Sequence, residues 1–195
     1  MKKVFWIIIL CLALQSCGTK KYANPHVIIT TKVGDIELEL YQKQAPKTVA
    51  AFLAYINEGL YDDASFYRVL NASDQASDAP KANLIQGGIW QTNPDKLATL
   101  KGIPHENTHH TGILHKNGTI SLAREAPGTA NSEFFICIGD QPGYDSGGAN
   151  NPDKQGYAAF GRVISGMDIV IKIYNMNQEN QSFDPPIPIY GIKEL

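Results

Sequence analysis

Apolar residues recur along this 195-residue chain in short runs, most of which alternate with polar residues or end at a turn. Alternation with period two is typical of strands with one buried face, and such runs are too short to be helices. The segment Val33-Gly34-Asp35 joins two of these runs into a hairpin. We expect eight strands, at residues 27–32, 36–41, 65–70, 84–88, 120–124, 134–138, 156–163 and 187–192.

Two segments instead repeat their apolar residues with the period of a helix. After Pro46, which suits a first helical turn, apolar residues recur at i, i+3, i+4 and i+7 up to Gly59. A shorter helix is predicted at residues 167–174. The tally predicts a mainly β fold, a closed eight-stranded antiparallel β-barrel capped by two α-helices.

Three segments between these elements are rich in turn-forming residues, at positions 71–83, 91–114 and 141–156. We expect all three to be irregular. The first and the third are long for loops of a compact barrel. They are either walls that select a substrate or solvated insertions.

The N-terminal residues follow a different pattern. Lys2 and Lys3 precede an unbroken apolar run at residues 4–14. As a helix, this run would rise about 16 Å, about half of the ~30 Å core of a bilayer, which indicates a signal peptide rather than a stable anchor. The Leu-Gln-Ser segment before Cys17 resembles the lipobox of bacterial lipoproteins. That resemblance implies cleavage before Cys17 and attachment of lipid to it; ordinary secretion is the alternative.

These features predict three parts: a lipoprotein signal peptide at 1–16, a lipidated tether at 17–25 and a folded domain at 26–195. The domain is then expected in the bacterial cell envelope, facing the periplasm or the exterior. It would be a monomer bound to a membrane through the lipid on Cys17.

Charge and cysteine content narrow the function further. Cleavage would change the net charge from −2 to −4, because residues 1–16 hold two lysines and no acid. A mildly acidic domain without a basic stripe is poorly suited to nucleic acid. Cys137 is the one cysteine outside residues 1–17, so no disulfide framework is possible, and we expect it to be a buried thiol.

Other candidate chemistry is weakly supported. Four histidines at positions 105, 109, 110 and 115 lack the spacing of a metal site, and we expect them to be solvated or hydrogen-bonded. The Asp- and Asn-rich residues 145–153 lack the spacing of a calcium loop. Ser121 and Ser132 lack the glycine-flanked turn of a hydrolase nucleophile. We therefore expect no metal and no cofactor.

Several segments, taken together and in order, resemble the cyclophilins, the β-barrel peptidyl-prolyl isomerases. Any one of them is a weak signal, but the set extends from about residue 27 to the C-terminus. The segments are Ala45-Pro46-Lys47-Thr48-Val49, Phe66-Tyr67-Arg68-Val69, Ile85-Gln86-Gly87-Gly88, Ile120-Ser121-Leu122-Ala123, Ser132-Glu133-Phe134-Phe135-Ile136, and Tyr157 to Val163 with Gly166-Met167-Asp168.

The resemblance implies roles for individual residues. Arg68 corresponds to the catalytic arginine of the family, and Gln86 to the glutamine that holds the substrate backbone. The remaining positions are implied to bind a proline-containing peptide. They are Phe135, Leu84 and Tyr144 around the proline ring, Ala123 and Arg124 along the extended chain, Glu133 beside the phenylalanine pair, and Tyr157 where many members have His.

An arginine suits this chemistry. Amide resonance opposes rotation of a peptide bond by ~18–20 kcal/mol, and rotation about Xaa-Pro exposes the lone pair of the prolyl nitrogen. A guanidinium that donates to this nitrogen stabilises the twisted state more than the planar one. The resemblance therefore implies a peptidyl-prolyl cis-trans isomerase, and the N-terminal pattern implies that it assists protein folding outside the cytoplasm.

The chain departs from the family pattern at three positions. Asn83 stands where Phe is common, Gly143 where better-known members place Trp, and Glu133 where they have Gln. Loss of the Trp position argues against tight cyclosporin binding. Glu133 either pairs with Arg68 or Arg124 or is a surface carboxylate. A non-catalytic proline-peptide-binding module or chaperone on the same barrel is the alternative function, and an envelope scaffold is a third.

Overall fold

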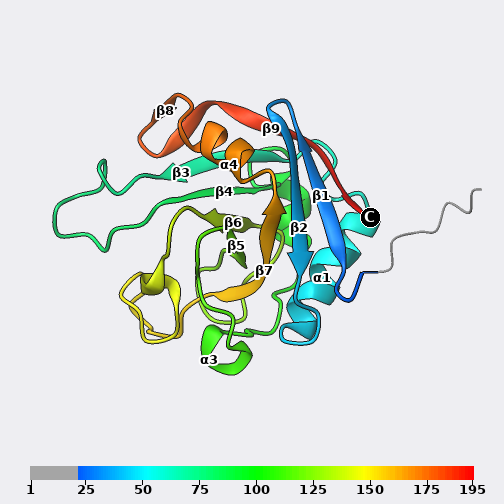
Figure 1. Ribbon diagram of the computed structural model, residues 1–195, viewed down its shortest axis with the longest axis horizontal. Coiled ribbons are helices and arrows are strands. Elements are labelled where there is room, and N and C mark those ends of the chain that lie inside the picture. Colours follow the sequence, from blue (N-terminus) through cyan, green and yellow to red (C-terminus); the bar gives the residue numbers. More distant parts are fainter. Residues whose placement is uncertain (1–21) are drawn as a thin grey trace, which may run out of the picture.

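A computed structural model describes residues 22–195, which form a closed antiparallel β-barrel (Figure 1). The hydrogen-bonded order is β1-β2-β7-β5-β6-β4-β3-β9, and pairing of β9 with β1 closes the ring of eight strands. The predicted fold is confirmed. The strands are β1 (His26–Thr31), β2 (Gly34–Leu40), β3 (Ser65–Leu70), β4 (Leu84–Gly88), β5 (Thr119–Leu122), β6 (Phe134–Cys137), β7 (Ala158–Ser165), the appended β8 (Gln178–Glu179) and β9 (Ser182–Glu194).

The barrel interior is filled by alternate side chains of its strands, as period-two patterns require. Val27 of β1 faces Leu38 of β2 across the ladder, and both side chains are fully buried. Aromatic rings occupy the centre. Phe52 of the first helix lies 5.9 Å from Phe134 and 5.1 Å from Phe160, measured between ring centroids. This packed interior leaves the outer surface to carry the site.

Both predicted helices are present, and Figure 1 shows them on opposite sides of the barrel. Helix α1 (Pro46–Asn57) and helix α4 (Met167–Tyr174) each bury an apolar face. Ala45, the residue before α1, offers no side-chain cap. Glu106 supplies one instead, because its carboxylate accepts the backbone N–H of Lys47 at 3.2 Å and of Thr48 at 2.8 Å. A negative group at the positive end of the helix dipole stabilises α1.

The segment 91–114 contains two short helices, so the prediction that it is irregular was wrong there. They are α2 (Pro94–Thr99) and α3 (Thr108–Thr111). Asn93 and Asn107 cap them by accepting the backbone N–H three residues later. Helices this short show no hydrophobic period, and the capping asparagines were the available signal.

Element ends also differ from the prediction. β9 begins at Ser182 rather than at residue 187, and β5 and β6 end before Arg124 and Ile138. The loop 141–156 contains a single 3₁₀ turn, η1 (Pro142–Tyr144). Strand ends at a barrel rim are set by pairing with neighbours, which a single segment does not encode.

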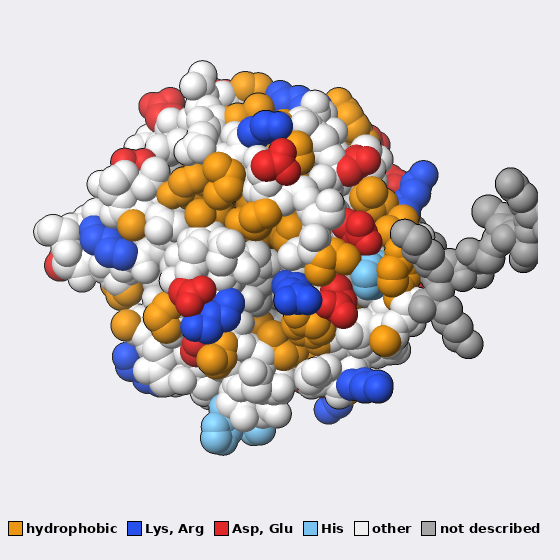
Figure 2. Space-filling model, in the orientation of Figure 1, with side chains coloured by type: hydrophobic (Ala, Val, Ile, Leu, Met, Phe, Trp, Pro, Cys, Tyr) orange, Lys and Arg blue, Asp and Glu red, His pale blue; other side chains and the backbone are white. Residues whose placement is uncertain are grey.

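The predicted signal peptide and the predicted lipid site at Cys17 lie outside the described residues. Within residues 22–195, no helix combines the length and the apolar character needed to cross a bilayer. On the face shown in Figure 2, Lys and Arg side chains are scattered, and several lie beside Asp or Glu. That face offers no continuous basic stripe to nucleic acid.

Candidate active site

A groove of about 990 Å³ crosses the outer surface of the barrel over β3, β4 and β6. The loops 71–83 and 141–156 contribute to its walls, so both are more than solvated insertions. All nine residues that the resemblance places at the site line this groove. They are Arg68, Leu84, Gln86, Ala123, Arg124, Glu133, Phe135, Tyr144 and Tyr157.

A bulge in β3 turns two consecutive side chains toward the groove. The β3–β4 ladder pairs Phe66 with Gly87 and then Arg68 with Gln86, which leaves Tyr67 as an extra residue. Phe66 packs in the barrel core, whereas Tyr67 and Arg68 both line the groove. A regular strand would send neighbouring side chains to opposite faces, so the bulge is what brings these two together.

The guanidinium of Arg68 is held from two sides by amides. Nη1 donates to Oε1 of Gln86 at 3.4 Å, and Nη2 donates to Oε1 of Gln181 at 3.3 Å. Gln181 lies in the turn between β8 and β9, where its φ of +66° is unusual for a residue other than glycine. None of the ion pairs within residues 22–195 includes Arg68, so the charge of its guanidinium is available to a ligand.

Beside Arg68 lies an apolar pocket built outside the barrel core. In β6, Phe134 faces the core while Phe135 faces the groove, because successive side chains of a strand alternate. The ring of Phe135 lies 5.1 Å from that of Tyr144 and 5.5 Å from that of Tyr157. Leu84 completes the pocket, with Cys137 buried behind it as the predicted free thiol.

A buried histidine supports the pocket from behind. The ring of His115 is stacked against Phe135 at 5.8 Å. Nδ1 lies 2.8 Å from Oδ1 of Asp145, and Nε2 lies 3.0 Å from Oγ of Ser121. This order of groups is that of a hydrolase triad, but Ser121 has no exposed surface and cannot reach a substrate. The three groups therefore brace the pocket.

Neither interpretation of Glu133 from the sequence was right. Its side chain contacts neither Arg68 nor Arg124, and only 9% of the residue is exposed. Oε2 accepts the hydroxyl of Tyr67 at 2.7 Å, and Oε1 accepts the backbone N–H of Ile89 at 2.8 Å. Burial raises the pKa of Glu133, and these hydrogen bonds oppose part of that rise.

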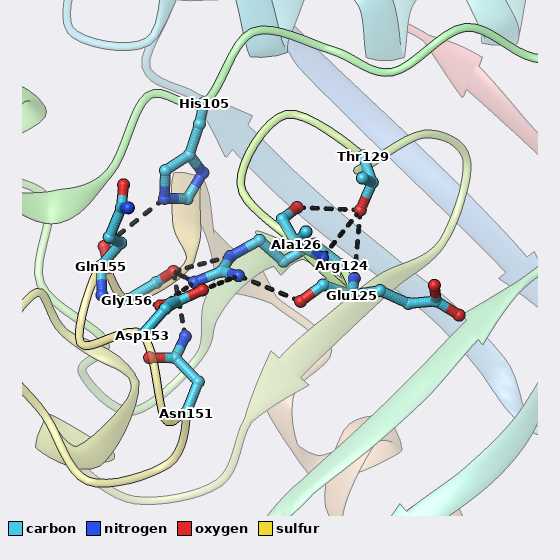
Figure 3. A network of polar contacts seen from close by, with 9 residues as sticks. All are labelled: His105, Arg124, Glu125, Ala126, Thr129, Asn151, Asp153, Gln155 and Gly156. Atoms are coloured by element: carbon cyan, nitrogen blue, oxygen red, sulfur yellow. Dashed lines mark hydrogen bonds and ion pairs between the residues drawn. The ribbon is translucent and has the colours of Figure 1, made fainter.

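The side chain of Arg124 anchors the loop 141–156, as Figure 3 shows. The side chain is only 1% exposed, and its guanidinium donates to both oxygens of Asp153 at 2.7 and 2.9 Å and to the carbonyl of Gly156 at 2.6 Å. It also lies 5.0 Å from the ring centre of Tyr157, within cation–π range. Arg124 therefore borders the groove mainly through its backbone, while its charge supports the wall at Tyr157.

The Arg124–Asp153 pair predicts a specific acid sensitivity. The hydrogen bond from Arg124 holds the pKa of Asp153 at about 2, below its ordinary value. A carboxyl group with a lowered folded-state pKa adds stability above its unfolded pKa and loses it as pH falls toward 2. We expect Asp153→Asn to lower the free energy of unfolding at pH 7 and to have a shrinking effect below pH 4. Urea unfolding at several pH values checks this.

The exposed pair of Asp168 with Lys172 provides the control for that experiment. Asp168→Asn removes one carboxylate from a solvent-screened surface pair, so its effect on unfolding should be small at every pH. Equal effects of the two substitutions across the pH range would contradict the anchoring role of Asp153.

At the two positions where the resemblance implies an aromatic side chain, Gly143 and Asn83, polar contacts are found instead. A Cβ on Gly143 would collide with the side chain of Asn150, whose Nδ2 also lies 3.4 Å from the carbonyl of Pro80. Asn83 accepts the hydroxyl of Tyr174 at 2.9 Å and the N–H of Ala72 at 2.8 Å. Asn150 therefore joins the loops 71–83 and 141–156 beside Gly143, whereas the side chain of Asn83 is held by α4 and by its own loop.

Sequence reasoning missed four groove residues, Tyr67, Trp90, Asn150 and Gln181, and the buried His115 behind the pocket. Tyr67 lies inside the Phe66-Tyr67-Arg68-Val69 motif and Trp90 lies two residues after Gly88, so their aromatic character was an available signal. Gln181 and Asn150 come from turns far along the chain, and their place depends on tertiary packing alone. The described residues contain no group of three side chains suited to hold a metal ion.

Comparison with known proteins agrees with this geometry. Residues 26–194 match the family model described as cyclophilin type peptidyl-prolyl cis-trans isomerase/CLD. The chain is 34% identical over 172 residues to a peptidyl-prolyl cis-trans isomerase of Acinetobacter baylyi, covering 88% of this chain and 83% of that one. It is 31% identical to peptidyl-prolyl cis-trans isomerase B of Escherichia coli, covering 83% and 92%.

Solved structures share the fold. A cyclophilin type peptidyl-prolyl cis-trans isomerase of Cryptosporidium parvum superposes with a TM-score of 0.69 at 22% identity, over 88% of this chain and 98% of that one. A second crystal structure of that protein, in the presence of the dipeptide Ala-Pro, gives a TM-score of 0.66 at 23% identity, over 86% and 96%. At such identities the likeness concerns the barrel.

Proposed function

Because this chain belongs to the cyclophilin-type peptidyl-prolyl cis-trans isomerases, we propose that Arg68 is the residue that accelerates rotation about Xaa-Pro bonds in bound polypeptides. The observation that supports this role is the position of a guanidinium at the edge of an apolar pocket, where it has no acidic partner among residues 22–195. The amides of Gln86 and Gln181 hold it there.

The reaction requires little from the protein besides position and charge. Uncatalysed rotation takes roughly 10–100 s because amide resonance must be broken. In the twisted state the prolyl nitrogen is pyramidal and its lone pair accepts a hydrogen bond, which the planar state does not. A donor already fixed beside the pocket stabilises the twisted state selectively. No covalent bond is made or broken, so Arg68 needs no nucleophile or proton acceptor as a partner.

The apolar pocket provides the grip that rotation needs. The pyrrolidine ring of proline is apolar and compact, and it suits the surface formed by Phe135, Leu84 and Tyr144. When the pocket holds the ring, the residue before proline can turn relative to it, and the motion is confined to rotation about the Xaa-Pro bond. Ala123 and the backbone of Arg124, just beyond the end of β5, lie along the groove where an extended peptide would run.

Substrates are proposed to be proline-containing segments of unfolded or extended chains. The relative from Cryptosporidium parvum, crystallised in the presence of Ala-Pro, supports a dipeptide-sized proline ligand for this fold. A non-catalytic peptide-binding module is the second candidate, motivated by the departures at Asn83, Gly143 and Glu133. It has less support, because Arg68 and Gln86 are both present and hydrogen-bonded to each other.

One experiment separates catalysis from binding. The domain from Tyr22 onward is added at a hundredth of the concentration of an Ala-Pro-containing tetrapeptide, and cis–trans exchange is followed by NMR exchange spectroscopy. An isomerase raises the exchange rate without changing the cis fraction. A binding module leaves the rate unchanged at this ratio, and that result would refute the catalytic proposal.

We also propose that the protein is a monomer that acts at the bacterial cell envelope, anchored through lipid on Cys17. The support is the sequence pattern of residues 1–17. The full chain and a Cys17→Ala variant should be expressed in a Gram-negative bacterium with labelled palmitate. Label and membrane fractionation are expected for the first only; absence of label from the unaltered chain would overturn the anchor.

A further inference from the structure

A line of hydrogen bonds extends from Arg68 along the groove to the largely buried carboxylate of Glu133. Gln86 accepts Nη1 of Arg68 at 3.4 Å, and its own Nε2 donates to the hydroxyl of Tyr67 at 2.7 Å. Tyr67 in turn donates to Oε2 of Glu133 at 2.7 Å. The line joins β3, β4 and the residue before β6, and it depends on the bulge that turns Tyr67 outward beside Arg68.

The direction of every bond in this line is fixed from the arginine end. A guanidinium only donates, so Gln86 must present its oxygen to Arg68 and its amide nitrogen to Tyr67. The hydroxyl oxygen of Tyr67 then accepts, and its hydrogen must go to another acceptor, which is Glu133. Burial and the nearby Glu133 raise the pKa of Tyr67 far above the physiological range, so this hydrogen is always present.

The far end of the line needs two acceptor oxygens, and this explains a carboxylate there. Oε2 of Glu133 accepts a hydrogen bond from the hydroxyl of Tyr67. Oε1 accepts one from the N–H of Ile89 at 2.8 Å and one from the hydroxyl of Ser132 at 3.0 Å. A glutamine has a single acceptor oxygen. Gly88 gives the carboxylate room, because a Cβ at that position would collide with both of its oxygens.

We propose that Glu133 and Tyr67 are positioning residues that fix the amide orientation of Gln86 and thereby hold the Arg68 guanidinium toward the groove. This inference rests on the proposed catalytic role of Arg68. Neither residue needs to touch the reacting bond. The alternative is that Glu133 only stabilises the backbone at Ile89. In that case, removing the hydroxyl of Tyr67 would leave catalysis unchanged.

Substitution by glutamine should reverse the line. In Glu133→Gln the oxygen is retained by Ile89 and Ser132, so the amide nitrogen faces Tyr67 and donates to it. Tyr67 must then donate to Gln86, whose nitrogen turns toward the guanidinium and no longer accepts from it. Gln181 still holds Nη2 of Arg68, so the expected loss in kcat is partial, about tenfold, with KM unchanged within twofold.

The test is a double-mutant cycle measured by NMR exchange on an Ala-Pro peptide. Tyr67→Phe should lower kcat by a similar factor. In the Tyr67→Phe background, Glu133→Gln should lower kcat by less than a further twofold, because both substitutions disrupt the same series of hydrogen bonds. Tyr61→Phe is the matched control, because its buried hydroxyl bonds the carbonyl of Ser132 outside the line. It should reduce stability and leave kcat within twofold.

Two kinetic results would overturn the inference. One is a Glu133→Gln variant with kcat within twofold of the unaltered chain, and the other is a double variant whose loss equals the product of the two single losses. A readout without activity keeps the test independent of the proposed function. The side-chain amide resonances of Gln86 should shift in Glu133→Gln and in Tyr67→Phe but not in Tyr61→Phe, and unchanged resonances would refute the line even if no isomerisation were detected.

Discussion

Replacement of Arg68 by alanine is expected to lower kcat/KM for an Ala-Pro peptide by about 10²–10³, the range seen when one preorganised donor to a transition state is removed. The pocket of Phe135, Leu84 and Tyr144 is untouched by this change, so the variant should still bind the peptide. Because the side chain is exposed and forms no ion pair within residues 22–195, the fold should survive. Exchange spectroscopy and a thermal melt measure both effects on one sample.

Two further variants sharpen this expectation. Arg68→Lys keeps the charge but loses the fork that bonds Gln86 and Gln181 together, so activity should fall between those of the unaltered chain and the alanine variant. Arg162→Ala is the control. Arg162 is an exposed arginine of β7 that pairs with Glu39, and its loss should leave activity unchanged. Full activity in Arg68→Ala would remove the proposed mechanism.

Phe135→Ala should abolish the grip on proline and also weaken the fold. The ring is 2% exposed and in contact with three other rings, so truncation leaves a cavity and costs about 3–5 kcal/mol of stability. With the pocket floor removed, KM for proline peptides should rise at least about tenfold, since several contacts of the bound ring are lost together. Denaturant unfolding and saturation kinetics measure the two losses separately.

The neighbouring residue provides a matched control. Phe134 is also fully buried, but its ring faces the barrel interior, where it packs on Phe52 and Tyr61. Phe134→Ala should cost similar stability and leave KM unchanged below its melting temperature. If either alanine variant fails to fold, the milder leucine pair at the same two positions is compared instead. Equal KM values for the Phe134 and Phe135 variants would show that the pocket is not the proline site.

The barrel follows from local patterns, and the resemblance to the cyclophilins supplied the residues of the site. The alternation in residues 27–32 and 36–41 specified a buried face for each strand, and each segment had turn residues beside it. The order of the motifs around Arg68, Gln86 and Phe135 specified which strands carry the groove. The strands depend on side-chain period and residue type, which are readable in a single chain, whereas the roles of the groove residues depended on the resemblance of these motifs to the cyclophilins.

Other features depended on distant partners. The burial of Glu133 reflects the absence of a side chain at Gly88 and the donors of Tyr67 and Ile89, none of which its own segment encodes. The brace formed by His115 requires Asp145, 30 residues away. Arg124 was placed at the groove, but the commitment of its charge to Asp153 could not be known before the loop 141–156 was seen.

The bulge at Tyr67 has a consequence for how the chain selects its own strand pairing. If β3 paired without the extra residue, the alternation beyond Phe66 would point Arg68 into the aromatic interior, where an unpaired cation is strongly disfavoured. The charge of Arg68 thus destabilises the pairing of β3 in the wrong register. A chain that has formed the complete barrel therefore already has the arginine side chain on the outer surface. An aliphatic residue such as leucine at position 68 would lift this penalty and allow the strand register to slip, so it would lower the yield of correctly folded chains in addition to removing the catalytic guanidinium.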